Sequence, residues 1–500
     1  MNYQQHLINA CQEGNVQEVH NCLLSNEIDI NQSSNDGMTP LHYACCNGHV
    51  DIVQLLLQQN EININSLDSS GISPLQMACA KGHINIVNIL LHQQSIDVNQ
   101  FAAQSDYSRM ILLDFACQNG NSDILELLLQ HKININETDY LGRTPLHFAC
   151  NEGHKNIVKL LLKQNNIEVN TTDKYGQTPL YFASTKGHES IVKMLLKQDK
   201  IEVNIINESG MTPLHAACMG NHENIVKILL KQNNIEVNSV DKNNETPLHA
   251  ACRQRNKNIV NLLLQQNNIE VNIINECGLT PLHFATEEGE INIIRSLLQK
   301  SNILVNTIDT SGRTPLHSAC SWNYKNIVKL LLQQNNIEVN TIDKYDETPL
   351  NIACRKGHEI IVNLLLQKNE ITINRDNNYG EVLIANAIRS NHIFIAKILI
   401  EKLCQTHEGL QPLQTFIFDR QETCLLELAE NCPEIFDMLN SIRNQKIKSA
   451  RTVVNVNDYP QNPNLENLTS IHEYGFFVDS KQAEKNELEE KSADEVKCKQ

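Results

Sequence analysis

The chain has 500 residues and a formal net charge of −17, and 41% of its residues are hydrophobic. Eight basic and ten acidic residues follow residue 444, so −15 of this charge lies before it, which disfavours nucleic acid and anionic membranes as partners. The run nearest to a membrane span, residues 393–403, is interrupted by Lys397 and Glu401, and the N-terminus has no basic segment followed by an apolar one. We therefore expect neither a membrane span nor a secretory signal.

One stretch, residues 142–154, recurs with its flanks along most of the chain. Its sequence is Gly-Arg-Thr-Pro-Leu-His-Phe-Ala-Cys-Asn-Glu-Gly-His, and successive motif alanines lie 33 or 34 residues apart with one exception. A period of this size indicates small units that stack in a row. The motif alanines are Ala10, Ala44, Ala78, Ala116, Ala149, Ala183, Ala217, Ala251, Ala285, Ala319, Ala353 and Ala387.

The first part of each unit predicts a short helix. Thr144 can accept a hydrogen bond from a free backbone N–H at the helix start, and Pro145 suits the first helical position. Ala149 and Cys150 are small residues on one apolar face, so a neighbouring helix can approach closely. Gly153 is expected to end this helix in the left-handed conformation.

A second helix is predicted from about His154, with Ile157 and Leu161 on one apolar ridge. A polar turn and a short extended segment, residues 164–170, lead to the tip of the next unit at 173–176. A unit this small cannot bury its own apolar face, so it must stack on copies of itself. We predict an all-α solenoid of about 12–13 helix-turn-helix units with β-hairpin tips.

The residues now match a family. The pattern Asp-x-x-Gly-x-Thr-Pro-Leu-His-x-Ala, followed by Gly-His, Ile-Val, Leu-Leu and Val-Asn, resembles the ankyrin repeat over about residues 1–442. In one departure, Asn165 and Asn166 stand where the family usually has a single glycine after the second helix. Because asparagine tolerates the left-handed conformation, a left-handed helix cap is still expected there.

Four segments follow from this pattern. Residues 1–34 lack the Thr-Pro-Leu-His start and are expected to form an N-terminal capping repeat, 35–404 the repeat array, 405–444 a divergent C-terminal repeat or cap, and 445–500 a disordered tail. Between Ala78 and Ala116 the spacing lengthens to 38 residues. This is either a degenerate repeat with a longer tip or a break in the stack, and the intact second helix that follows favours the former.

The cysteines and motif histidines have a structural and a metal-binding interpretation. His147 and Cys150 lie three residues apart on one predicted helix, but a zinc site needs about four converging ligands. We favour cysteines that pack as small apolar residues in a reducing compartment, and histidines that tie helix starts together. We expect the protein to bind no metal and no cofactor. We expect it to lie in the cytoplasm or, alternatively, in the nucleus. The residues concerned are Cys11, Cys45, Cys79, Cys117, Cys150, Cys218, Cys252, Cys320 and Cys354, with His42, His147, His215, His249, His283 and His317.

The resemblance to ankyrin repeats implies that partners bind at the tips and at the ends of the first helices, along a concave groove. Trp322 is the only tryptophan and lies between an acidic pair in the preceding repeat and a basic pair in the next one. Tryptophan and arginine are enriched in binding hot spots, so we expect contact to centre there. The alternative is a partly buried ring that packs on Tyr324. The other candidate residues are Glu287, Glu288, Arg355, Lys356, Arg253, Gln254, Arg313, Lys344, Tyr345, Tyr140, Arg143, Lys174 and Tyr175.

Three classes of function remain in view. The leading one is a non-catalytic scaffold or adaptor, monomeric, that holds a partner protein. The second is the substrate-recognition subunit of a ubiquitin ligase or another signalling complex, with the tail recruiting the effector. An enzyme is the third, and the repeats leave little chain for a catalytic core. A row of lysines on the outer helices, Lys159, Lys193, Lys227 and Lys329, is either a surface for an acidic partner or, as we favour, a solvated face.

Overall fold

The computed structural model describes residues 3–25, 28–99, 112–373, 379–405, 429 and 432–453. Every regular element in these residues is an α-helix, which confirms the predicted all-α class. Residues 1–436 form one unit and 437–500 another, of which the described residues 437–453 continue the last helix. None of the described helices combines the length and the apolar character that a bilayer span needs.

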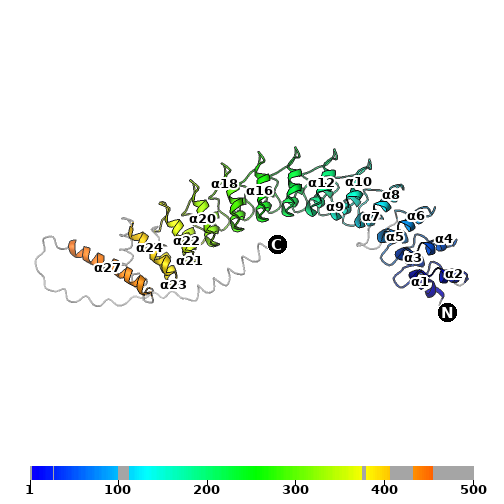
Figure 1. Cartoon of the computed structure of the whole chain (residues 1–500), viewed down its shortest axis with the longest axis horizontal. Helices are drawn as coiled ribbons and strands as arrows, with labels where there is room; N and C mark the ends of the chain where they lie inside the picture. The colour runs from blue at the N-terminus through cyan, green and yellow to red at the C-terminus, as the bar shows by residue number, and fades with distance from the viewer. Residues whose placement is uncertain are drawn as a thin grey trace. The chain divides into compact units, whose positions relative to one another are not determined.

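Twelve pairs of short helices make up most of the first unit (Figure 1). The first helices of the pairs are α1 (Tyr3–Glu13), α3 (Pro40–Asn47), α5 (Pro74–Lys81), α7 (Leu112–Asn119), α9 (Pro145–Glu152), α11 (Pro179–Lys186), α13 (Pro213–Met219), α15 (Pro247–Arg253), α17 (Pro281–Glu287), α19 (Pro315–Ser321), α21 (Pro349–Arg355) and α23 (Tyr379–Arg389). The second helices are α2 (Val16–Leu23), α4 (Val50–Leu57), α6 (Ile84–Leu91), α8 (Ser122–Leu128), α10 (Lys155–Leu161), α12 (Glu189–Leu195), α14 (Glu223–Leu229), α16 (Lys257–Leu264), α18 (Ile291–Leu298), α20 (Lys325–Leu332), α22 (Glu359–Leu366) and α24 (Ile393–Gln405).

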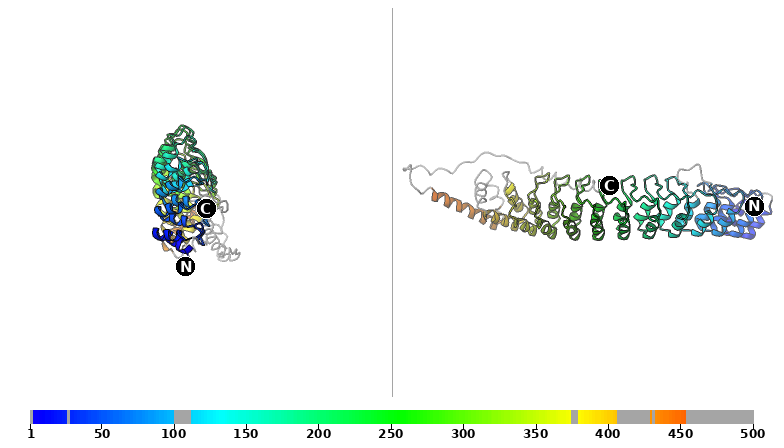
Figure 2. Two further views of the ribbon diagram at one scale, coloured as in Figure 1. Left: turned by 90° about the vertical axis from the view of Figure 1, so that its right-hand side faces the viewer. Right: turned by 90° about the horizontal axis from the view of Figure 1, so that it is seen from above.

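The pairs follow one another in chain order, as Figures 1 and 2 show. Each first helix contacts the first helices of the repeats before and after it, and the second helices do the same. Helix α7 contacts both α5 and α9, so the repeat after the long spacing continues the stack rather than breaking it. The insertion itself, residues 100–111, lies outside the described residues.

The core consists of the predicted apolar slots. Leu146, Ala149 and Cys150 of α9 are buried, as are Ile157 and Leu161 of α10. All nine cysteines of the motif slot are buried and none forms a disulfide. Burial raises the pKa of the Cys150 thiol, so this side chain stays protonated and packs as an apolar group.

The motif histidine joins the start of its helix to the next repeat. The backbone N–H of Thr246 donates to His249 Nδ1 at 3.1 Å, and the N–H of His249 donates to Thr246 Oγ1 at 3.4 Å. His249 Nε2 lies 3.2 Å from the carbonyl oxygen of Leu279 in the following repeat. Because Nδ1 accepts from an N–H and Nε2 must donate to a carbonyl, these partners require the neutral ring with its proton on Nε2.

In several repeats a second histidine forms a bond to the preceding repeat. His154 Nε2 donates to the carbonyl oxygen of Gln118 at 2.9 Å, and His188 Nε2 makes the same bond to Asn151 at 3.0 Å. In the repeat that has tyrosine in this slot, the Tyr324 hydroxyl donates to the carbonyl oxygen of Glu287 at 3.4 Å. Each link therefore connects neighbouring repeats in a fixed direction.

A ladder of asparagine side chains forms a third connection. Asn272 Nδ2 donates to the carbonyl oxygen of Asn302 at 2.7 Å, while Asn272 Oδ1 accepts from the backbone N–H of Leu304 at 2.9 Å. Only an amide can donate and accept in this way, which explains the repeated asparagine. The residues that make both bonds are Asn31, Asn65, Asn136, Asn170, Asn204, Asn238, Asn272, Asn306 and Asn340.

The tips are hairpin turns organised by the side-chain oxygen of an Asp or Asn. In the tip of residues 139–143, Asp139 Oδ1 accepts from the backbone N–H groups of Leu141 and Arg143, at 2.9 and 2.7 Å. Two backbone bonds, Asp139 N–H to Arg143 and Gly142 N–H to Asp139, close the turn. No β-strand is assigned among the described residues, because each tip is held by its own turn and by single bonds to its neighbours rather than by a ladder.

The C-terminal ends of the first and second helices of a repeat are capped differently. Gly153 ends α9 with φ +82°, as predicted, and Asn323 takes the same conformation in a later repeat. The predicted left-handed cap at Asn165 and Asn166 is wrong, since neither residue has a positive φ. Instead Gln164 Nε2 donates to the carbonyl oxygen of Leu160 at 3.3 Å. The side chain satisfies a helix-end carbonyl that a left-handed cap would otherwise satisfy.

The C-terminal end of the first unit is covered in part. The Lys397 side chain of α24 pairs with Glu434, at the start of α27 (Pro433–Val453), and Ile435 and Ala429 are buried. Within the predicted C-terminal repeat or cap, residues 406–428 lie outside the described residues.

Stability of the array should decrease with acidification. Burial, the largest cause, lowers the pKa of His249 from 6.5 to about 4, and that of His147 and His283 likewise. Between pH 6.5 and about 4 the unfolded chain binds protons that these folded rings do not bind, so the free energy of unfolding falls as pH falls. Each histidine contributes up to about 1.4 kcal/mol per pH unit in this window. Urea unfolding of His249→Gln at pH 7 and pH 5 should show a smaller pH dependence than the parent chain.

Glutamine is a suitable replacement, because Gln76 Oε1 accepts from the backbone N–H of Ser73 at 2.8 Å in the same slot of another repeat. The exposed His92→Gln controls for removing one histidine from the surface. An unchanged pH dependence in His249→Gln would contradict the assignment of the neutral ring.

Asn272→Asp tests the asparagine ladder. The carboxylate keeps the acceptor but loses the donor, and it faces the carbonyl oxygen of Asn302. We expect a loss of about 1–2 kcal/mol in the free energy of unfolding, measured in urea by circular dichroism. Asn268→Asp is the matched control, since residue 268 joins the ladder only through its backbone carbonyl. Equal losses in the two variants would show that added charge, not the lost donor, is responsible.

Candidate functional site

Trp322 stands directly after α19, as the residue that caps it. Its backbone N–H donates to the carbonyl oxygen of Ser318 at 3.0 Å, which fixes the backbone, while 60% of the residue is exposed. More than half of the residue is thus exposed, and Lys356 of the next repeat lies over its ring. Tyr324, the expected packing partner, donates to the preceding repeat instead.

The two members of the basic pair differ in their surroundings. Lys356 Nζ lies 5.9 Å from the centroid of the Trp322 ring, within the range of a cation–π interaction. Burial lowers the pKa of Lys356, and the positive charges of Arg355 and Arg313 add to this shift. Arg355 makes two bonds of 2.8 Å to Glu347 in its own repeat. Lys356 thus lies over the tryptophan ring, and Arg355 is paired with Glu347.

The acidic pair is weaker as a negative site than its sequence indicates. Burial raises the pKa of Glu287 to about 7, with Asp309 and Glu288 adding to the shift and Arg253 opposing it. Glu288 binds Arg255, whose Nε lies 2.7 Å from the carboxylate. Sequence reasoning did not single out Arg255, which occupies the slot of Gly153 with φ +58°. A charged residue in a glycine slot was the available signal.

Ion pairs within the array also hold three arginines of the candidate site. Arg143 pairs with Asp139 at 2.7 Å, and its guanidinium carbon lies 4.5 Å from the centroid of the Phe148 ring. Arg253 pairs with Glu245 and stacks at 4.7 Å on the Phe284 ring. Arg313 pairs with Asp343 of the next repeat at 3.1 Å and lies 5.7 Å from the Tyr345 ring. These cations are positioned, and their charge is partly neutralised.

The predicted residues gather into two aromatic and basic groups. The Trp322 group consists of Trp322, Lys356, Arg313 and Tyr345, connected through the contacts of Lys356 and Arg313. In the Tyr140 group, Lys174 Nζ lies 5.6 Å from the Tyr140 ring and 5.3 Å from the Tyr175 ring, and both tyrosines are exposed. Gln254 and Lys344 are exposed and belong to neither group.

The surface also has exposed apolar residues that the sequence reasoning missed. Ile206, Val240, Ile274, Ile308 and Ile342 precede the tip Asp or Asn of successive repeats, 34 residues apart. Their regular spacing was visible in the sequence, but their exposure was not.

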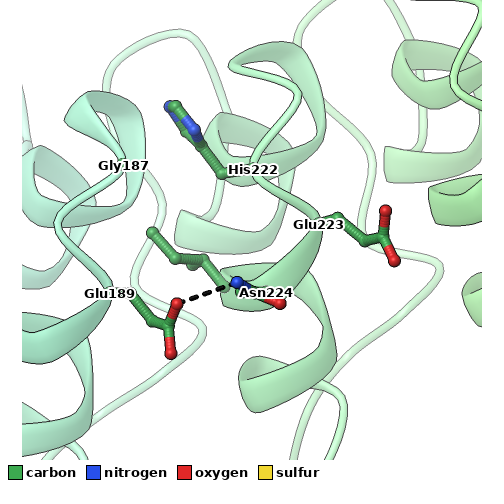
Figure 3. A pocket seen from close by; sticks show the side chains of 6 residues that line it. Gly187, Glu189, His222, Glu223 and Asn224 are labelled. Atoms are coloured by element: carbon green, nitrogen blue, oxygen red, sulfur yellow. Dashed lines mark hydrogen bonds between the residues drawn. The ribbon is translucent and has the colours of Figure 1, made fainter.

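A shallow pocket between the second helices α12 and α14 is lined by hydrogen-bonded side chains that join two repeats (Figure 3). Asn224 Nδ2 donates to Glu189 Oε2 at 2.9 Å across it, and His222 and Glu223 complete the lining. The next repeat has the same bond, from Asn258 to Glu223 at 2.9 Å, so this pocket is a seam between repeats.

Metal ligation is not suggested by the geometry. Across the part of the chain that the structure describes, no three His, Cys, Asp or Glu side chains converge as ligands. Both ring nitrogens of His147, which lies three residues before Cys150, are engaged by Thr144 and by the carbonyl oxygen of Gln177.

Comparison with known proteins agrees with the repeat geometry. A family model described as ankyrin repeats (3 copies) matches residues 7–102, 113–207, 199–275, 267–343 and 335–409. A search of curated proteins gave no match. With stacked helix pairs, turn-shaped tips and a family match over most of its length, the chain belongs to the ankyrin-repeat family.

Proposed function

We propose that this chain is a non-catalytic scaffold or adaptor that binds a partner protein, with the contact centred on the Trp322 group. Ankyrin repeats generally serve as protein–protein interaction modules. The observation that carries the proposal is a tryptophan that is 60% exposed and has an ammonium group 5.9 Å from its ring. Exposed aromatic residues next to cations are typical of binding hot spots.

The arrangement favours binding over chemistry. Arg313 and Lys356 meet the exposed faces of Tyr345 and Trp322, and the ion pair of Arg313 with Asp343 fixes one of these cations in place. Side chains held in this way lose little conformational entropy when a partner binds. The partner would lie along the face of first-helix ends and tips, and the chain itself would be a monomer.

Trp322→Ala should weaken partner binding. Removal of a hot-spot tryptophan costs about 2 kcal/mol or more, which is about 30-fold in affinity. Partners are first identified by affinity purification and mass spectrometry, and their affinities are then measured by calorimetry for the parent chain, Trp322→Ala and Lys356→Ala. Phe394→Ala removes another exposed aromatic ring, from α24, and is the control. If each identified partner binds Trp322→Ala and the parent chain equally, the proposed centre is wrong.

Deletion of residues 454–500 distinguishes the scaffold function from that of a ubiquitin-ligase subunit. A scaffold that binds through its repeats should retain its partners at unchanged affinity, because the Trp322 group lies within the array. A substrate-recognition subunit that recruits its effector through the tail should lose ligase components and keep its substrate. Quantitative mass spectrometry of purified full-length and shortened chains distinguishes these outcomes.

A further inference from the structure

Five exposed aliphatic residues form a regular row, here called the tip ladder. Its members share one slot in successive repeats, directly before the tip Asp or Asn, and they are 40–56% exposed. The valine three residues earlier does the packing in each of these repeats and is 1–2% exposed. The ladder residues are Ile206, Val240, Ile274, Ile308 and Ile342, and the buried valines are Val203, Val237, Val271, Val305 and Val339.

Neither the core nor the turn requires an apolar side chain in this slot. The two preceding repeats carry Thr138 and Thr172 there, and their tips are closed by the same backbone bonds, from Asp139 to Arg143 and from Asp173 to Gln177. A run of five aliphatic residues in an exposed slot therefore needs a cause outside the repeat itself, and contiguous exposed apolar surface marks an interaction site.

The ladder is widest near its C-terminal end. Leu304 occupies the slot that holds glutamate in the neighbouring repeats, and it is 55% exposed. The Thr307 hydroxyl donates to the Leu304 carbonyl oxygen at 3.4 Å, which closes the turn between Leu304 and Ile308. Together with Ile274 and Ile342, these residues offer the broadest apolar area of the ladder.

The spacing of the ladder is fixed. Adjacent tips are joined by backbone bonds, such as Lys242 N–H to Ser209 at 2.9 Å and Lys344 N–H to Ser311 at 2.9 Å. Packed helices lie about 8–10 Å apart, so successive ladder residues are separated by about 10 Å. Seven residues of an α-helix rise about 10.5 Å. An apolar residue at every seventh position of a helix would therefore meet successive members of the ladder.

Acidic side chains follow one side of the ladder. The slot four residues before each ladder position holds an exposed glutamate in four of the five repeats, and the Ser239 hydroxyl, adjacent to Val240, donates to Glu236 Oε2 at 3.2 Å. This bond holds the Glu236 carboxylate beside the residue that precedes Val240. On the other side the residues after the tip Asp or Asn are mixed, with Glu208, Lys242, Glu276, Thr310 and Lys344. The acidic slot comprises Glu202, Glu236, Glu270 and Glu338.

We propose that the tip ladder docks a basic amphipathic helix of a partner protein, with an apolar residue at every seventh position and Lys or Arg beside them. The proposal rests on the chain being an interaction module, and it adds a row of contacts next to the Trp322 group, since Ile308 and Ile342 directly precede the tips that hold Arg313 and Tyr345. Apolar contact supplies affinity, and the glutamates select a cationic partner. A second copy of the chain is a poor occupant, because each copy carries a net charge of −17 and the same acidic row.

The test uses the full chain and synthetic helical peptides of about 29 residues, since five ladder residues span about four heptads. The first peptide has leucine at every seventh position flanked by lysines. The second replaces its lysines with glutamates, and the third replaces its leucines with serines. Fluorescence anisotropy should show the first peptide binding at least about tenfold more tightly than either of the others.

The ladder variant Ile274→Thr, Ile308→Thr, Ile342→Thr should weaken binding of the first peptide at least about tenfold. Threonine already occupies this slot in two repeats, so the fold is expected to persist, and circular dichroism checks it. The matched control, Ile84→Thr, Ile360→Thr, Phe394→Thr, removes three exposed apolar residues from the second helices and should leave the affinity unchanged.

Three results would overturn the proposal. These are equal binding of the first peptide by the ladder variant, equal binding of the lysine and glutamate peptides, and a dimer in analytical ultracentrifugation that the ladder variant abolishes. Trp322→Ala keeps these outcomes apart from those of the proposed function, because it should leave peptide binding intact while it weakens the partner centred on the Trp322 group.

Discussion

The structure depends on one constraint: a single helix pair cannot cover its own apolar face. Leu146 and Ile157 are fully removed from water only because the neighbouring repeats lie on both sides of α9 and α10. The polar links obey the same constraint, since His249 and Asn272 find their partners in the next repeat and His154 in the preceding one. Core and hydrogen bonds therefore both act between repeats, and surface slots are left free to vary.

Features that depend on residue type and local spacing could be predicted from the sequence. Features that depend on contacts between side chains could not. The Thr-Pro helix start, the left-handed Gly153 and the buried cysteines follow from residue type and spacing. The second helix end did not, because the side-chain amide of Gln164, the residue directly before the two asparagines, donates to the free helix-end carbonyl of Leu160. Likewise the charges of the candidate site were counted correctly, but their pairing, as between Arg255 and Glu288, depends on contacts across repeats.

The candidate surfaces differ in how their side chains are held. Arg143, Arg253 and Arg313 are oriented by ion pairs and by aromatic rings, so much of their charge is satisfied within the array. Trp322 and the tip ladder residues are 40–60% exposed and present apolar area at the surface. The proposed recognition would combine apolar contacts with charges that set orientation, and the two sets of residues need not serve the same partner.

The directional histidine links have a consequence for the length of the array. The forward link from His249 spans 30 residues and the backward link from His188 spans 37, and each recurs in several of the 34-residue repeats. Gain or loss of one whole module would place equivalent donors and acceptors opposite each other again across the new junction. Tandem duplication is thus a route of growth that this architecture tolerates, which helps to account for so long a chain of nearly identical units.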